Sequence, residues 1–295
     1  MAKNILVFTK DYAGQQLLKY LKELKIYPFI ASVSKNDALQ KKTGSVYKYE
    51  KDFQIFEVSS STYEYAKNII PQADYIICVD WKKDYFSGIN INCPVYYMQP
   101  SLLPKYRGYG AVSQQILRGV VYSGVTIYEY NGIIDGGDIV YQKEIKIEDY
   151  FNASDFIDIT SKKTAEFIKE LYNNKKFEKR KQNNSIAFYL PKIRSSSKVV
   201  DFNASAVSLY NFIRAYSFPY GMVSFYYKGK EYKIASASIE SWSGVEGRPG
   251  EVISQNDYGL IVACGSGSIL IKEVEIDGSI MKAHMINAFD GDIFL

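Results

Sequence analysis

Short apolar segments alternate with helix-compatible segments over roughly the first hundred residues, and this alternation limits the possible folds more than any other feature. Residues 4–8 form the first apolar segment, and the leucines that follow it recur at helical spacing. The later apolar segments span 28–33, 53–58, 74–81 and 94–98. This alternation predicts βα units and a mostly parallel, Rossmann-like α/β sheet with flanking helices. Open sheets bind ligands at the carboxyl ends of their strands, so the loops after Val79 and Met98 are candidate sites.

The alternation of strand-like and helix-compatible segments changes from Gly124 onward. Residues 124–130 and 138–147 read as two alternating strands around a glycine-rich connection, which predicts an antiparallel edge to the sheet. Residues 152–171 return to helical spacing, and the charged segment 175–184 is predicted to be an exposed connection.

The final third of the chain lacks the βα alternation and has short strand-like segments separated by turn residues. Several short strands joined by tight turns predict a small all-β domain, an OB-like barrel. We place the boundary near residue 204. Residues 1–204 are then an α/β domain with its connecting helix and linker, and residues 205–295 are the barrel.

Composition excludes several classes of protein. The 36 basic and 32 acidic side chains leave a net charge of only +4, which predicts no strong field for nucleic acid. The three cysteines lie far apart in apolar segments, which favours buried thiols in a reducing compartment over a metal site. The opening apolar segment is too short for a signal peptide, and no 18-residue apolar stretch follows, so we predict a soluble, cytoplasmic protein.

Two loops concentrate the residues that could bind a ligand. The first is Gln99–Gly108, in which two prolines and a glycine present Ser101, Lys105 and Arg107 to a polar or anionic ligand. Arg107 could instead hold the loop through carbonyl contacts. The second is Asp135–Asp138, where two glycines let the backbone approach a ligand beside two carboxylates, or simply form a tight turn.

Together with residues 123–126, these loops resemble the formyltransferase family that uses 10-formyltetrahydrofolate. The family pattern matches without a break over 100–108, 124–126 and 135–138, and similar segments occur at 215–222 and 248–267. The resemblance implies an α/β domain followed by a small barrel, with 10-formyltetrahydrofolate as co-substrate. Members of the family formylate methionyl-tRNA, UDP-aminoarabinose and other nucleotide-linked amino sugars.

The family's catalytic residues are an asparagine, a histidine and an aspartate, and only the aspartate remains here, as Asp135. Tyr97 and Gln99 occupy the other two positions. The resemblance therefore implies a catalytic trio of Asp135, Gln99 and Tyr97. An amide can donate a hydrogen bond to an oxyanion but cannot carry a proton near neutral pH. The only histidine is His284, so proton transfer falls to Asp135, Tyr97 or water.

A slow enzyme, a changed chemistry and a purely binding homologue all stay open, as does a structural role for Asp135. By the resemblance, the folate contacts Val79, Asp80, Trp81, Leu102 and Asp138. Trp81 could equally be a packed core residue. The acceptor would approach the loop residues Ser101, Lys105, Arg107, Gly108 and Tyr109.

The choice of acceptor rests on two segments. Residues 79–81 and 137–144 are more similar to sugar N-formyltransferases, which favours a nucleotide-linked amino sugar as the small-molecule substrate. A tRNA substrate is less favoured, although Lys35, Lys41, Lys42 and Lys48 lie in one loop. We expect no membrane partner, and a homodimer is left open.

Overall fold

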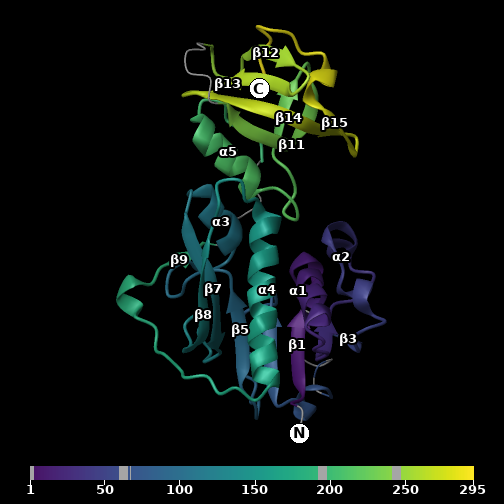
Figure 1. Ribbon diagram of the computed structural model, residues 1–295, viewed down its shortest axis with the longest axis vertical. Coiled ribbons are helices and arrows are strands. Elements are labelled where there is room, and N and C mark those ends of the chain that lie inside the picture. The colour runs from purple at the N-terminus through teal and green to yellow at the C-terminus, as the bar shows by residue number, and fades with distance from the viewer. Residues whose placement is uncertain (1–2, 60–65, 67, 192–197, 241–246) are drawn as a thin grey trace. The chain divides into compact units, whose positions relative to one another are not determined.

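The computed structural model describes residues 3–59, 66, 68–191, 198–240 and 247–295 (Figure 1). The chain divides into two compact units. Unit 1 comprises residues 1–112, 121–149 and 154–193, and unit 2 comprises residues 113–120, 150–153 and 194–295. Unit 2 thus begins before the boundary predicted near residue 204 and includes two short segments from earlier in the chain. The functional boundary itself stays a prediction.

Unit 1 is built on a seven-stranded sheet with the order β3-β2-β1-β4-β5-β7-β8. Its strands are β1 (Ile5–Thr9), β2 (Phe29–Ser32), β3 (Ile55–Glu57), β4 (Tyr75–Val79), β5 (Val95–Gln99), β7 (Tyr122–Glu129) and β8 (Ile139–Lys146). The first five strands in the sheet order pair in parallel, whereas β7 is antiparallel to both β5 and β8. The predicted parallel sheet and its antiparallel edge are both confirmed.

The helices of unit 1 pack through amphipathic faces. They are α1 (Asp11–Glu23), α2 (Ala38–Thr43) and most of α4 (Ala153–Tyr172), and α3 (Ala111–Leu117) begins at its boundary. The 3-10 helices are Val46–Tyr49, Ile70–Gln72 and Asn184–Ile186. In α1 the predicted helical spacing buries Leu17, Leu18 and Leu21 completely. The helix predicted over 152–171 is confirmed as α4.

The two faces of the sheet bury different side chains, and this decides where the site residues point. Phe167 of α4 packs against Tyr96 of β5, with the ring centroids 5.9 Å apart. On the other face, Tyr97 joins a core cluster with Phe8 of β1 and Cys78 of β4. Since neighbouring residues of a strand point to opposite faces, Tyr97 and Gln99 share the face away from Phe167.

A short two-stranded sheet lies apart from the main sheet of unit 1. Its strands are β6 (Arg107–Gly108) and β9 (Tyr189–Leu190), which pair in parallel. The pairing connects the Gln99–Gly108 loop with the segment that follows α4. That segment, predicted to be an exposed connection, is largely exposed, but it also contacts the candidate site.

Unit 2 contains the helix α5 (Ala206–Ala215), most of α3 and an antiparallel sheet among its described residues. The strands are β10 (Ser224–Tyr227), β11 (Lys230–Glu240), β12 (Val252–Asn256), β13 (Gly259–Ala263), β14 (Ser268–Ile276) and β15 (Ser279–Lys282), followed by the 3-10 helix Ala283–Ile286. The predicted short strand-like segments correspond to β10–β14, whereas α5 and β15 were not predicted. A separate antiparallel β unit is confirmed, and its OB-like character stays a prediction.

Among the described residues, no helix combines the length and apolar character needed to cross a membrane. The three cysteines are free thiols, with Cys78 and Cys264 buried and Cys93 half-buried.

Candidate active site

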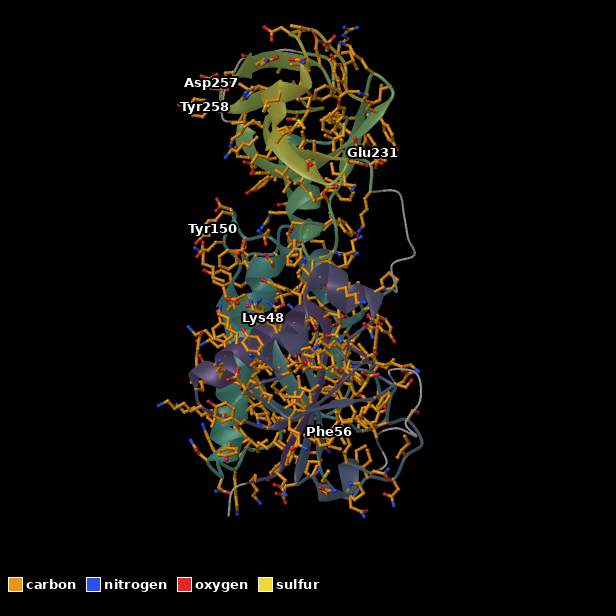
Figure 2. The ribbon with its side chains drawn as sticks, turned by 90° about the vertical axis from the view of Figure 1, so that its right-hand side faces the viewer. Lys48, Phe56, Tyr150, Glu231, Asp257 and Tyr258 are labelled. Carbon is orange, nitrogen blue, oxygen red and sulfur yellow. The ribbon has the colours of Figure 1, made fainter. Side chains whose placement is uncertain are left out.

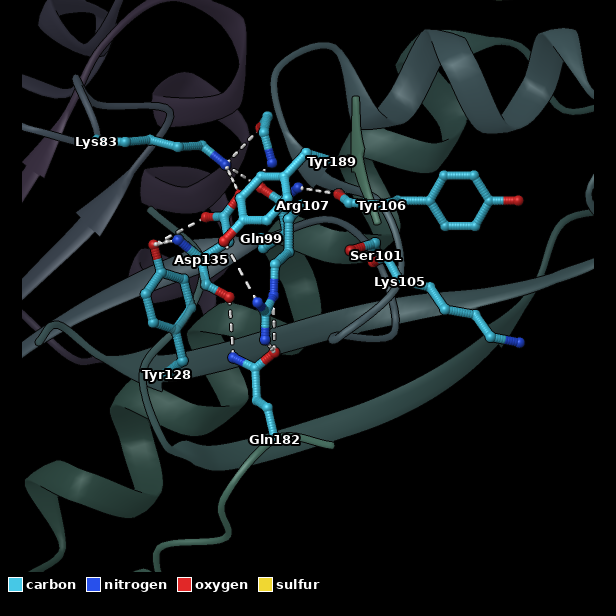
Figure 3. Close-up of polar contacts among 11 residues, drawn as sticks. Lys83, Gln99, Ser101, Lys105, Tyr106, Arg107, Tyr128, Asp135, Gln182 and Tyr189 are labelled. Carbon is cyan, nitrogen blue, oxygen red and sulfur yellow. Dashed lines mark hydrogen bonds and ion pairs between the residues drawn. The ribbon is translucent and has the colours of Figure 1, made fainter. Parts of the chain in front are cut away.

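The candidate site lies where the loops after β4 and β5 meet the connection between β7 and β8 (Figure 3). Gln99 is the last residue of β5, and Asp135 lies in the β7–β8 connection. Lys83, from the loop after β4, joins them. Its ammonium group donates to Gln99 Oε1 at 2.5 Å, to the Gly108 carbonyl at 2.7 Å and to Asp135 Oδ2 at 2.5 Å. Gln99 and Asp135 therefore converge as predicted, with a lysine between them that was not predicted.

Asp135 is completely buried and its carboxylate is saturated with donors. Besides Lys83, Oδ2 accepts from the backbone N–H of Gly108 at 2.6 Å, and Oδ1 accepts from the Tyr128 hydroxyl at 2.8 Å. The Asp135 backbone has a positive φ of 53°, which aspartate tolerates better than most residues. These donors come from the loop after β4, from β6 and from β7, so three separate segments hold the Asp135 carboxylate.

Lys83, Gln99, Gly108, Tyr128 and Asp135 form a polar cluster. Lys83 is its most exposed member, although its side chain is only 13% exposed. Burial lowers the pKa of the Lys83 ammonium, and the charge of Asp135 opposes that shift. The pKa of the Tyr128 hydroxyl is raised well above its ordinary value by burial and by the neighbouring Asp135. The cluster thus holds one cation and one anion in a space that is nearly closed to water.

Gln99 is buried and its orientation follows from its partners. Lysine can only donate, so the amide oxygen must face Lys83. The amide nitrogen then donates to the Tyr106 carbonyl at 2.7 Å. One amide hydrogen remains beyond this bond.

Tyr97 lies on the same strand face but makes different contacts. It is 2% exposed, and its hydroxyl donates to the Lys82 carbonyl at 3.0 Å. Its ring stacks on Tyr128 with centroids 6.0 Å apart. Burial raises the pKa of the Tyr97 hydroxyl, and among the described residues no hydrogen bond links it to Gln99 or Asp135. These contacts are those of a core residue, and its catalytic assignment stays a prediction.

Tyr97→Asn, which returns the residue found in the family pattern, should therefore destabilise the protein. The change removes a buried aromatic ring and leaves a cavity, so we expect a loss of about 3 kcal/mol in the free energy of unfolding. Tyr97→Phe keeps the ring and should lose only about 1 kcal/mol with its hydrogen bond. Urea denaturation of both variants measures this difference, and equal losses would contradict the core role of the ring.

Arg107 is buried and held by side chains of the connecting segment, and its predicted contact with the acceptor stays a prediction. The guanidinium is 4% exposed and donates to Gln182 Oε1, at 2.7 Å from Nη2, and to Asn184 Oδ1 at 2.8 Å. Gln182 in turn donates to the backbone carbonyls of Asp135 and Gly137, at 2.9 and 2.7 Å. The alternative that Arg107 holds the loop is supported, with side-chain amide oxygens of the connecting segment as acceptors in place of the expected backbone carbonyls.

The other predicted acceptor residues divide into buried and exposed groups. Ser101 is completely buried and its hydroxyl donates to the Lys105 carbonyl at 3.0 Å, so it shapes the loop. Lys105 is exposed, and its side chain points away from Asp135 in Figure 3. Gly108 has a positive φ of 98°, and its carbonyl contacts Lys83 while its N–H contacts Asp135. Tyr109 is 39% exposed, and its ring centroid lies 6.0 Å from Lys83 Nζ.

The predicted folate residues lie in three places. Val79, Asp80 and Trp81 lie at and after the end of β4, Leu102 lies in the loop after β5, and Asp138 lies immediately before β8. Val79 is buried, and Trp81 packs its ring against Phe8 at 5.5 Å, as expected of a core aromatic. The Trp81 Nε1–H nevertheless has no acceptor among the described residues, which leaves a buried donor unsatisfied. Asp80 is exposed, and Leu102 and Asp138 are half-buried.

Sequence reasoning missed Lys83, Tyr128 and Gln182. Lys83 lies in the loop after Val79, which was predicted to be a candidate site because it follows the carboxyl end of a strand, so its position was a signal. Tyr128 and Gln182 gave no comparable signal, because an alternating strand and an exposed connection are full of such residues.

The chain is similar to known proteins both in sequence and in fold. A family model described as formyl transferase matches residues 38–172, and one described as formyl transferase, C-terminal domain, matches residues 192–289. A methionyl-tRNA formyltransferase from Pseudothermotoga lettingae is 33% identical over 202 residues, which cover 66% of this chain and 64% of that protein. The match thus spans less than two thirds of the curated relative.

Two solved structures share the fold. HypX from Aquifex aeolicus in complex with tetrahydrofolic acid has a TM-score of 0.65 at 16% identity, covering 97% of this chain and 47% of that one. An N-formyltransferase from Helicobacter canadensis, in complex with folinic acid and dTDP-3-aminofucose, has a TM-score of 0.61 at 19% identity. That match covers 92% of this chain and 99% of the other.

Proposed function

Because the chain belongs to the formyltransferase family, we propose that it transfers a formyl group from 10-formyltetrahydrofolate to the amine of a nucleotide-linked amino sugar. The observation that carries this proposal is the convergence of Asp135 and Gln99 on Lys83, in the loops that contain the family's sequence pattern. Such a cluster concentrates hydrogen-bond donors and a carboxylate at the edge of the sheet where ligands bind.

Formyl transfer requires a hydrogen-bond donor for the formyl oxygen and groups that support movement of a proton. A bond forms between the acceptor nitrogen and the formyl carbon, negative charge develops on the formyl oxygen, and the nitrogen loses a proton. Gln99 has one amide hydrogen to offer to the formyl oxygen. Asp135 supplies the negative charge that supports proton movement, although its complete burial places it behind Lys83. Bound 10-formyltetrahydrofolate would supply the formyl carbon.

The residues just after β4 and just before β8 offer polar groups suited to a folate. The unsatisfied Trp81 Nε1–H is a donor within a mostly apolar cluster, and an unsatisfied buried donor is a reason to look for a ligand acceptor. The half-buried Asp138 makes no side-chain hydrogen bond among the described residues, so its carboxylate is available for an amino-substituted heterocycle. The half-buried Leu102 offers an apolar side chain from the loop after β5.

Two observations support an amino sugar as acceptor. The Helicobacter canadensis enzyme, solved with dTDP-3-aminofucose, matches this chain along almost its whole length. Segments 79–81 and 137–144 are also similar to sugar N-formyltransferases. Since Arg107 is engaged in the connecting segment, the exposed Lys105 is the better candidate for the diphosphate.

A tRNA acceptor is the second candidate, because the curated relative described above is a methionyl-tRNA formyltransferase. Lys41, Lys42 and Lys48 are exposed, and Figure 2 shows Lys48 at the surface of unit 1. Lys35 is paired with Glu50 at 2.7 Å, which reduces the positive charge of this loop. With a net charge of +4 for the whole chain, we favour the amino sugar.

Acceptor assays separate these candidates. The purified chain is incubated with 10-formyltetrahydrofolate and either UDP- and dTDP-amino sugars or methionyl-tRNA, and products are identified by mass spectrometry. We expect an N-formyl sugar nucleotide. Formylation of methionyl-tRNA alone would replace our first choice with the second. Calorimetry with 5-formyltetrahydrofolate runs in parallel, and binding without any product would indicate a non-catalytic folate-binding protein.

A further inference from the structure

We propose that Lys83 is a catalytic residue, whose ammonium group donates to the formyl oxygen and carries the proton that the transfer moves. This inference rests on the proposed function and deepens it. It assigns to Lys83 the proton-carrying task for which Gln99 is chemically unsuited.

The first observation behind this inference is the position of Lys83 between Gln99 and Asp135. Lys83 Nζ lies within 2.5 Å of oxygens on both Gln99 and Asp135, the two residues at family catalytic positions. Gln99 is 2% exposed and Asp135 is not exposed at all, whereas the Lys83 side chain is 13% exposed. A ligand that enters from the surface therefore meets Lys83 before it can reach the carboxylate. Asp135 is then a positioning residue, which acts by holding the ammonium group.

The second observation is that the Lys83 ammonium has neutral acceptors that it can exchange for a ligand oxygen. Two of the three oxygens that Lys83 contacts are neutral carbonyls, those of Gln99 and Gly108. A formyl oxygen that gains negative charge is a stronger acceptor for the ammonium than either, because Coulomb attraction between opposite charges adds to the hydrogen bond. Lys83 can thus exchange a neutral acceptor for the reacting oxygen while its ion pair with Asp135 stays intact.

The proton balance is complete with Lys83 alone. As the acceptor nitrogen bonds to the formyl carbon, the carbonyl electron pair moves onto the oxygen and is stabilised by the ammonium. When the bond between the formyl carbon and N10 breaks, the electron pair returns to the carbonyl and Lys83 gives a proton to N10. The neutral amine of Lys83 then takes the proton released by the acceptor nitrogen. Lys83 begins and ends as an ammonium, and no other reactant is needed.

The electrostatic surroundings suit this task. Burial lowers the pKa of Lys83 and so makes its proton easier to transfer at neutral pH. The charged groups that face it are Asp135 from the β7–β8 connection and Asp80 from its own loop, and both oppose the shift. The ring of Tyr109 faces it from the loop before α3. Activity should fall as pH rises through the Lys83 pKa, because the ammonium form starts the reaction.

Three variants test the assignment. Lys83→Met removes the charge and should lower kcat by about 100- to 1000-fold, as the loss of an oxyanion donor does in other enzymes. Lys83→Arg keeps the ion pair but cannot release its proton, so it should lose about 100-fold in kcat together with the alkaline decline of the pH profile. Lys82→Met is the matched control, since the Lys82 side chain is exposed and pairs only loosely with Asp84 at 3.6 Å.

A binding measurement decides the case if turnover is absent or if Lys83→Met fails to fold. Calorimetry compares 10-formyl-5,8-dideazafolate with 5,8-dideazafolate, two stable ligands that differ only in the formyl group. In the wild type, Lys82→Met and Lys83→Arg, the formyl group should tighten binding by about tenfold, because a charged donor meets its oxygen. In a folded Lys83→Met this preference should disappear.

The outcomes separate the two proposals. A wild type that forms no product with any acceptor, yet prefers the formylated ligand through a charge at position 83, would overturn the proposed function and leave the Lys83 contact standing. Equal affinity of the wild type for the two ligands would overturn the contact. If Lys83→Met or Lys83→Arg keeps a kcat within threefold of the wild type, the catalytic assignment of Lys83 is wrong.

Discussion

Asp135→Asn should lower the free energy of unfolding by about 3 to 5 kcal/mol, because it removes one charge of a buried ion pair and leaves the other unpaired. Asp135 is completely buried, and its carboxylate accepts from Lys83, the Gly108 amide and the Tyr128 hydroxyl. Lys83 would then retain the desolvation that lowers its pKa without the opposing charge of Asp135. Formyl transfer should fall with the loss of this positioning, while folate affinity changes little.

A double-mutant cycle isolates the ion pair from the rest of the substitution. Adding Lys83→Met to Asp135→Asn removes both charges, so the double variant should be more stable than Asp135→Asn alone. The control is Asp84→Asn in the exposed Lys82–Asp84 pair, where both side chains are about half exposed and little change is expected. Additive losses in the cycle, measured by urea denaturation, would show that Lys83 and Asp135 are not energetically coupled.

Gly137→Ala should produce the second large effect, a loss of about 3 kcal/mol or more in the free energy of unfolding, since overpacking without room to relax is costly. A Cβ atom at Gly137 would lie 1.7 Å from the Glu129 carbonyl oxygen, a backbone atom in β7 that cannot move alone. The Gly137 carbonyl also accepts from Gln182. Displacing this turn should therefore move Asp135 away from Lys83 and reduce formyl transfer.

Gly132→Ala in the same connection is the matched control. No atom lies within 4 Å of a Cβ built there, and the only penalty is the positive φ of 89°, which should cost about 1 kcal/mol. Thermal unfolding and transfer rates of the two variants are compared under the same conditions. A Gly137→Ala protein as stable and as active as Gly132→Ala would mean that the turn is not held tightly against β7.

The sequence by itself determined the fold class and the loops that carry the site. Apolar segments of strand length alternating with helical spacing predicted β1, α1, β2, β3, β4 and β5 in turn, because burial of one face imposes its period on the residues. The family pattern over 100–108 and 135–138 then located Gln99 and Asp135, which meet at the carboxyl edge as expected. Local patterns therefore sufficed for most strands of the main sheet and for two residues of the cluster, but they missed α5 and β15.

Only the tertiary structure decided which side chains complete the cluster. Arg107 and Gln182 are 75 positions apart in sequence, yet their side chains are hydrogen-bonded at 2.7 Å, and the arginine that looked available to a ligand is engaged. Lys83 and Asp135 are 52 positions apart and form a buried ion pair. No periodicity encodes such pairs, since they depend on where separate loops end in space. Charged and amide groups pair with the partners that the fold brings within hydrogen-bond distance, and in this chain the fold brings Lys83 to Gln99 and Asp135.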